Sequence, residues 1–249
     1  MNYHWNWAIF FDTSPDGVHT YLQTLLLGAG WTLATALCAG LLAFSFGSLV
    51  GVLRTTPYPW LVRLAAAYVE LFRNIPLLVQ MFLWYFVLPE LVPATIGTWL
   101  KELPNSPFYT AVVALGFYTS ARVAEQVRAG ISALPRGQRM AALALGLTLP
   151  QAYIYALLPM AYRILLPPLT SEFINIIKNS AVALTIGLME LTARARAMQE
   201  FSFQVFEAFT AATLIYIAIN IAVTYGMRRL ERKVAVPGFI GAAPRAATH

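Results

Sequence analysis

Charged side chains interrupt the otherwise uncharged segment 103–132. Arg122, Glu125 and Arg128 are its only charged residues. An arginine guanidinium can bind a carboxylate through two parallel hydrogen bonds. Because a charge in apolar surroundings needs a partner or water, Arg122 is a candidate contact for an anionic ligand. The alternatives are that Arg122 extends to an aqueous interface or pairs with Glu125 or Glu172.

A second polar group lies in segment 170–180. Glu172, Asn175 and Asn179 have the spacing i, i+3, i+7, which places them on one face of a helix, with Lys178 beside them. We expect this face and Arg122 to line one polar substrate pathway. Arg122 and Asn179 are expected on opposite sides of the membrane midplane, so a site that contains both requires tilted or kinked helices.

The other intramembrane charges are expected to be structural. Glu70 and Arg73 are three residues apart on one helical face, and so are Glu125 and Arg128. Each pair is expected to form an ion pair. Arg163 is expected to extend to the cytosolic interface.

The reactive side chains give no sign of catalysis. Cys38 is alone, which excludes an intrachain disulfide, and is expected to be a small core residue. Residues 84–86 are aromatic and are expected to pack or face lipid. The three histidines lie near the termini without metal-ligand spacing. The sequence therefore predicts no metal, no bound cofactor and no enzyme.

The composition is that of a membrane protein. Hydrophobic residues make up 59% of the 249 and charged residues 11%, whereas a soluble domain has about a quarter charged residues. A helix needs about 20 apolar residues to cross the bilayer. We predict an all-α membrane protein with five transmembrane helices, the fourth broken by Pro159, Pro167 and Pro168. The predicted spans are 21–53, 64–88, 108–131, 153–179 and 208–227.

The basic residues predict the orientation. Twelve of the seventeen lie beside or between spans on one side, which the positive-inside rule assigns to the cytosol. The net charge of +6 is thereby explained without a nucleic-acid partner. Residues 1–20 would be periplasmic, without the basic start of a cleavable signal, and residues 234–249 would form a cytosolic tail.

The connecting segments follow from this orientation. Residues 89–107, with four prolines, are predicted to be a short external connection. Residues 132–152 would be a cytosolic loop too short to span. Residues 180–200 would be re-entrant or lie at the outer interface.

The cytosolic loop contains a spaced motif in "GQRMAALALGLTLPQAYIYALLPMAYRILLPPL". Its small residues Ala141, Ala142 and Gly146 could simply permit close helix packing. The spacing, however, resembles the loop of ABC importer permeases, Glu-Ala-Ala, three residues, Gly, nine residues, Ile, one residue, Leu-Pro. Met140 replaces the Glu and Ala156 the Ile, while the two alanines, the glycine, Leu158 and Pro159 match.

Four more stretches extend the resemblance, in order, over most of residues 20–233. They are "ELFRNIPLLVQMFLWYF", "AEQVRAGI", "LLPPLTSEFINIIKNSAVALTIGLMEL" and "FEAFTAATLIYIAINIAVTYGMRRLERK". The chain resembles permease subunits of the polar amino-acid uptake family (histidine, glutamine and glutamate permease-like), and most of all the glutamate/aspartate type. Its transmembrane domain would cover 21–233 and lie in the bacterial inner membrane.

The resemblance implies partners. No lysine follows the Gly-x-x-x-x-Gly pattern of a phosphate-binding loop, so ATP and Mg²⁺ would bind a separate ATPase dimer. A short cytosolic coupling helix between spans three and four, about Arg136 to Leu149, would dock in a groove on it. A second permease subunit or a second copy, a periplasmic amino-acid-binding protein and membrane lipid complete the expected partners. The expected coupling residues are Arg136, Gln138, Met140, Ala141, Ala142, Gly146 and Pro159.

Two departures from the family pattern point to the substrate. Arg122 replaces a residue that is commonly aromatic, and Asn179 replaces the Asp of a Lys-Asp pair. A buried Asp would repel an anion, so both changes favour glutamate or aspartate. The alternatives are another polar amino acid (glutamine, histidine or arginine) or a secondary transporter, which is usually longer and built from repeats.

Overall fold

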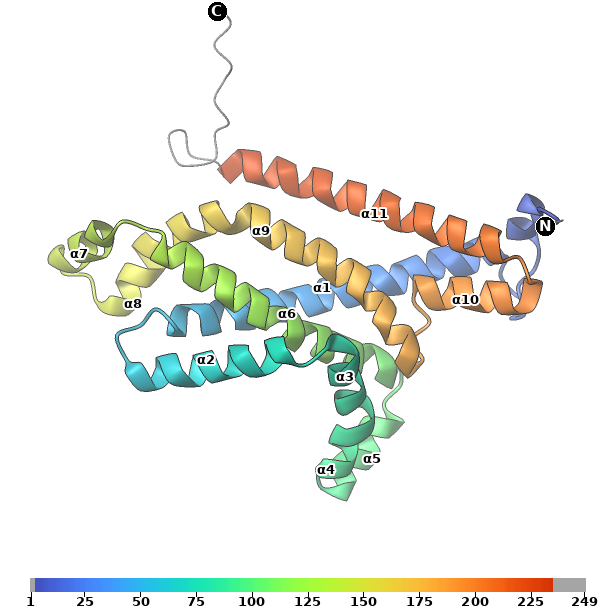
Figure 1. Cartoon of the computed structure of the whole chain (residues 1–249), viewed down its shortest axis with the longest axis horizontal. Helices are drawn as coiled ribbons and strands as arrows, with labels where there is room; N and C mark the ends of the chain where they lie inside the picture. Colours follow the sequence, from blue (N-terminus) through green and yellow to red (C-terminus); the bar gives the residue numbers. More distant parts are fainter. Residues whose placement is uncertain (1–2, 235–249) are drawn as a thin grey trace, which may run out of the picture.

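The computed structural model describes residues 3–234, apart from the side chain of Arg136. These residues are helical and contain no β-strand beyond an isolated bridge between Thr13 and Thr20. Figure 1 shows the helices, which are α1 (Tyr21–Leu53), α2 (Pro59–Asn74), α3 (Leu77–Phe82), α4 (Leu88–Leu91), α5 (Ala94–Glu102), α6 (Ser106–Ser132), α7 (Arg136–Ala144), α8 (Leu149–Ala152), α9 (Leu158–Asn179), α10 (Leu191–Ser202) and α11 (Val205–Val234). Two π-helical turns, η2 (Leu83–Val87) and η3 (Tyr153–Leu157), and two 3-10 turns, η1 (Trp7–Phe11) and η4 (Ser180–Ile186), connect them. Beyond Val234, the predicted cytosolic tail lies outside the described residues.

The centre of the bundle is the contact between α1 and α6. A Cβ atom at Gly47 would lie 2.6 Å from the carbonyl oxygen of Ser120, and one at Gly51 would lie 2.7 Å from that of Ala124. Only glycine therefore permits this approach of two helix backbones. Helix α9 packs on α6, and α11 packs on α9 and α10.

The lengths of the helices confirm a membrane protein in coarse outline. Three helical segments are long and apolar enough to span a bilayer: α1, the stretch Leu149–Ile186 and α11. A fourth candidate is the pair Pro59–Asn74 and Leu77–Leu91, which is bent by 101°. Helix α6, which carries Arg122, Glu125 and Arg128, is not among them, so five spans remain a prediction.

The predicted second span over 64–88 is not one continuous helix. Helix α2 ends at Asn74 and Ile75 is extended (φ −94°, ψ 126°). Pro76 favours this break, because a proline disfavours the α conformation in the residue before it and has no N–H to continue the helix.

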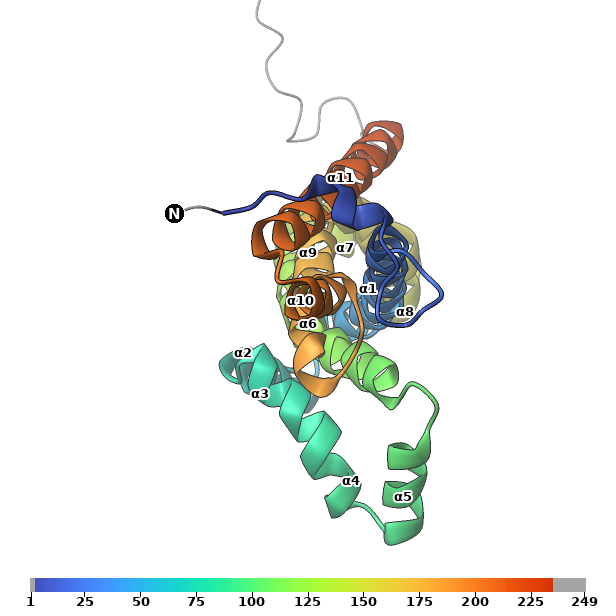
Figure 2. The same ribbon diagram turned by 90° about the vertical axis from the view of Figure 1, so that its right-hand side faces the viewer.

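The predicted external connection at 89–107 contains most of two helices, and its side of the membrane stays a prediction. Helices α4 and α5 pack against each other, and with α3 they project from the bundle as an arm (Figure 2). Here the prolines start helices: Pro89 lies in the first turn of α4, and Pro93 is the N-cap of α5.

The fourth helix is not broken at Pro167 and Pro168, contrary to the prediction. Helix α9 continues through both, although the carbonyls of Arg163 and Ile164 lose the N–H donors that residues 167 and 168 would otherwise supply. In the next turn, Thr170 Oγ1 donates to Leu166 O at 2.9 Å and Ser171 Oγ to Pro167 O at 3.4 Å. The irregularity lies earlier, at η3, just before Pro159 in the first turn of α9.

The basic residues gather at one end of the molecule. Figure 1 shows that the C-terminal ends of α1, α6 and α11 lie at the end that also carries α7. This end therefore holds Arg54, Arg128, Arg139 and the basic last turns of α11, as the positive-inside rule requires of a cytosolic face. Helix α10 lies toward the opposite end, in agreement with an outer interfacial segment. The orientation itself remains a prediction.

Candidate substrate pathway and coupling surface

Arg122 lies at the packed face between α6 and α9 without a carboxylate partner. Its Nη2 donates to the hydroxyl of Tyr118 at 2.7 Å, and its Cζ lies 4.9 Å from the centre of the Tyr118 ring. Within the described residues it forms no ion pair, because Glu125 is bound by Arg54 and Arg128. The alternative that Arg122 pairs with Glu125 was therefore wrong.

Glu172 belongs to the same polar cluster as Arg122. Gln126 lies one turn after Arg122 on α6 and donates from Nε2 to Glu172 Oε1 on α9 at 3.0 Å. Two acceptors in this cluster, Glu172 Oε2 and Gln126 Oε1, are buried without a hydrogen-bond partner. The cluster thus combines a cation whose N–H groups are largely free with two unsatisfied buried oxygens.

The other predicted pathway residues lie farther along α9. Asn175 is half-buried one turn beyond Glu172. Asn179, the last residue of α9, is half-buried about 10 Å beyond Glu172 at 1.5 Å per residue. Lys178 is exposed, and neither it nor Asn179 makes a side-chain hydrogen bond or ion pair within residues 3–234. The structure therefore bonds Gln126, one turn after Arg122 on α6, to Glu172 of α9, and it joins none of the three to Asn179.

Tyr118 and Gln126 were missed by sequence reasoning. They lie four residues before and four residues after Arg122, and that spacing alone would have placed them on its face of the helix.

The predicted pairing of Glu125 with Arg128 is confirmed and enlarged. Arg128 Nη2 donates to Glu125 Oε1 at 2.5 Å, while Arg54 at the end of α1 donates to Oε2. Glu125 thus ties α1 to α6. By contrast, Glu70 and Arg73 are both exposed and form no ion pair in the described part of the chain, so that prediction was wrong.

Two further expectations concern burial. Cys38 is exposed on α1, so its prediction as a core residue was wrong. It lies on the side of α1 away from the buried Ala36 and Ala39. The aromatic residues divide: Trp84 and Tyr85 pack against the core, whereas Phe86 is 54% exposed.

The predicted coupling helix is α7, which is shorter than expected. It ends at Ala144 because Gly146 has a left-handed backbone (φ +84°). Gly146 N–H donates to Leu143 O at 3.0 Å and Leu147 N–H to Ala142 O at 3.2 Å. These two hydrogen bonds define a Schellman motif with glycine at C′. The left-handed backbone of this motif explains why the loop pattern has a glycine at position 146.

The exposed side of α7 is apolar. Met140 is 68% exposed, and Ala141, Leu143 and Leu145 are exposed beside it, whereas Ala142 is buried against the bundle. Gln138 and Arg139 are half-buried. Pro159 lies in the first turn of α9, which follows α8 and η3 along the chain. Such an apolar surface at the basic end of a helical bundle is typical of a docking site for another protein.

Comparison with known proteins agrees with this geometry. Residues 43–236 match the family described as the inner membrane component of binding-protein-dependent transport systems. The chain belongs to this family of ABC importer permeases.

Within the described residues, no three His, Cys, Asp or Glu side chains form a group that could hold a metal.

Individual relatives cover the chain almost completely. The chain is similar to the glutamate/aspartate import permease protein GltJ of Escherichia coli K12, with 52% identity over 97% of this chain and 99% of that protein. It is 35% identical to a probable glutamine ABC transporter permease protein, GlnM, of Bacillus subtilis 168, over 92% of this chain and 98% of that one.

Solved structures show the same fold. An amino acid ABC transporter crystallised with histidines superposes with a TM-score of 0.72 at 30% identity, over 86% of this chain and 95% of that chain. The inward-facing MetNI methionine ABC transporter superposes with a TM-score of 0.73 at 22% identity, over 90% and 100%, which shows likeness of fold alone.

Proposed function

We propose that this chain is the permease subunit of an ATP-driven importer that moves glutamate and aspartate across the inner membrane. The observation that supports this most directly is the cluster of Arg122, Gln126 and Glu172. Its guanidinium has no carboxylate partner, and two buried oxygens beside it have no donor.

The cluster has the polarity of an amino acid. An ammonium group carries three donors and can satisfy Glu172 Oε2 and Gln126 Oε1. A carboxylate of the same substrate can then bind the guanidinium of Arg122 bidentately. Asn175 and Asn179 continue a neutral polar face along α9 that does not repel a second carboxylate.

The substrate class rests on two supports. One is the similarity to a permease whose name states glutamate and aspartate. The other is the presence of a cation and an uncharged Asn179 on the path. Glutamine, histidine or arginine is the alternative, since the acceptors of the cluster suit the ammonium of any amino acid.

Energy would come from outside this chain. We propose five spans with a periplasmic N-terminus and a cytosolic C-terminus. The exposed surface of α7 would dock on a separate ATPase dimer that binds ATP and Mg²⁺. A periplasmic binding protein would deliver the amino acid, and a second permease subunit or a second copy of this chain would complete the path. No cofactor would bind this chain itself.

The assignment can be tested with Arg122→Tyr in proteoliposomes that contain the whole transporter. Losing a charge-assisted bidentate contact should lower glutamate and aspartate uptake about tenfold or more. Asn179→Asp should lower uptake in the same direction by repulsion. Arg163→Gln, which removes an exposed arginine of α9, is the matched control.

The outcomes separate the alternatives. If Arg122 binds the side-chain carboxylate, Arg122→Tyr removes the preference for glutamate over glutamine; if it binds the α-carboxylate, uptake of both falls equally. Unchanged uptake kinetics in both Arg122→Tyr and Asn179→Asp would contradict the assignment of these residues to the substrate pathway. Uptake that persists without ATP would contradict the proposal that the transporter is ATP-driven.

A further inference from the structure

The bend between α2 and α3 leaves a backbone carbonyl without its helical donor. In an α-helix the carbonyl of Phe72 would accept from the N–H of residue 76, but Pro76 has none. Ile75, at the bend, has a second carbonyl outside the helical pattern. Phe72 and Ile75 are both half-buried, and a buried carbonyl without a donor is costly.

Gln80 supplies the missing donors. Its Nε2 donates to Phe72 O at 2.8 Å and to Ile75 O at 3.0 Å. The side chain is only 2% exposed, and its Oε1 is buried without a partner. Gln80 therefore stabilises the bend through the two hydrogens of its Nε2. It lies one helical turn after Pro76, and this spacing brings its amide group to the bend.

The direction of α3 bears on the substrate pathway. Leu77 and Met81 of α3 lie in one core cluster with Leu115 of α6 and Ile176 of α9. Trp84, in the π-helical turn η2 that follows, stacks on Phe117 with ring centres 5.5 Å apart and planes 12° apart.

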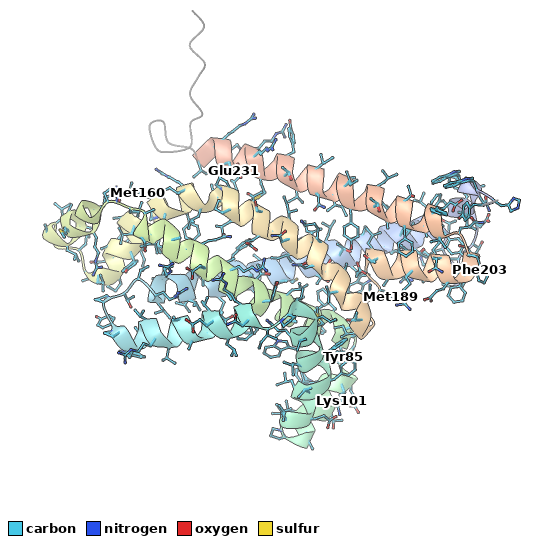
Figure 3. All side chains as sticks on the ribbon, viewed as in Figure 1. Tyr85, Lys101, Met160, Met189, Phe203 and Glu231 are labelled. Carbon is cyan, nitrogen blue, oxygen red and sulfur yellow. The ribbon has the colours of Figure 1, made fainter. Side chains whose placement is uncertain are left out.

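Phe117 precedes Tyr118, which holds Arg122. The arm, on which Figure 3 labels Tyr85 of η2 and Lys101 of α5, continues in the direction that α3 gives it.

We propose that Gln80 is a positioning residue of the transport path, whose amide replaces the N–H that Pro76 lacks. It fixes the 101° bend and so keeps Trp84 stacked on Phe117 of α6, the residue before Tyr118. This role concerns the shape of the path and does not depend on which amino acid is transported.

The first test is Gln80→Met in the complete transporter, because methionine has similar length and no donor. Uptake should fall about tenfold at equal amounts of assembled complex, as expected when buried carbonyls lose their donors. Val79→Met, an exposed neighbour on α3, is the matched control and should transport normally. Undiminished uptake in Gln80→Met would overturn the proposal.

A second measurement reports the bend directly. In a Cys38→Ser background, spin labels at Ala67→Cys on α2 and Thr95→Cys on α5, both exposed positions, give the distance across the bend. We expect one narrow distance distribution with Gln80 and a broader or shifted one with Gln80→Met. Lost uptake with an unchanged distance distribution would show that Gln80 acts by another route.

The third test isolates the role of Pro76. Pro76→Ala supplies an N–H that reaches the carbonyl of Phe72 only when the helix continues through residue 76, so this variant alone should shift the distance across the bend and lower uptake. Adding Gln80→Met to it should then cost much less further uptake than Gln80→Met costs in the wild type. If Gln80→Met alone does not assemble, the double variant should still do so. Equal losses in both backgrounds, or a double variant that also fails to assemble, would contradict the proposal.

Discussion

At the scale of single residues, two buried polar side chains, Gln80 and Glu190, bind backbone groups that lack a helical partner. Glu190 has no exposed surface and caps the start of α10 by accepting from the N–H groups of Thr192 at 2.9 Å and Ala193 at 2.8 Å. It also accepts from Tyr216 of α11 at 2.8 Å and from Thr32 of α1 at 3.4 Å. One carboxyl group thus joins three helices.

The ionisation of Glu190 should make stability depend on pH. Burial raises the pKa of its carboxyl group above that of an exposed glutamate, outweighing the hydrogen bonds that lower it. Its contribution to folding is therefore fully present below the ordinary glutamate pKa and is lost as pH rises through the raised pKa of the folded state. Thermal melting of the purified complex should show this decline with pH.

Glu190→Gln should flatten that pH dependence, because glutamine stays neutral. Glu200→Gln, on the exposed face of α10 in an ion pair with Arg196, should leave it intact. Identical pH slopes for wild type and Glu190→Gln would show that another group is responsible.

At the scale of helices, the glycine at the end of α7 should decide how firmly the coupling surface is held. A Cβ atom at Gly146 meets nothing within 4 Å, so Gly146→Ala is strained only through its positive φ. That strain is about 1–2 kcal/mol. We expect weaker coupling, measured as less amino acid transported per ATP hydrolysed in proteoliposomes.

Gly137→Ala provides the control for this prediction. Gly137 lies within α7, also has free space around it and lacks the positive φ, and alanine is the better helix former. Coupling should be kept or improved. Equal loss in both variants would mean that the backbone at 146 is not the cause.

The sequence predicted helices where one signal was sufficient. Hydropathy alone placed α1 and α6 within a few residues, and the pair Glu125–Arg128 followed from spacing. Prolines were misread because their effect depends on position: Pro76 bends a span, Pro167 is accommodated inside a helix, and Pro89 starts one. Tertiary contacts decide which of these outcomes occurs, and the residues next to each proline in the sequence do not reveal those contacts.

The candidate site was predictable to the same degree. Glu172 and Arg122 were predicted as pathway residues, but the side chain that bonds Glu172 across the two helices is Gln126, an uncharged residue of α6 one turn after Arg122. The expected contact of Cys38 with the core failed for a similar reason, because a span that is apolar all round gives no sign of which face is buried.

At the scale of the whole molecule, the gathering of basic residues at one end fixes the expected topology. In a Cys38→Ser background, Val18→Cys, at a position that is 78% exposed near the start of α1, should react with a membrane-impermeant thiol reagent added to spheroplasts. Ala133→Cys, exposed at the end of α6, should react only after permeabilisation. The reverse pattern would invert the orientation.

The glycine contact between α1 and α6 limits how the molecule can move. Neither helix can slide along the other without driving a side chain into a carbonyl oxygen at Gly47 or Gly51. We therefore expect the two helices to move as one unit, which includes the wall of the proposed substrate pathway that carries Arg122. We expect access to alternate through displacement of the opposite wall, α9, so that the substrate remains on a fixed cation while Glu172 moves away from it.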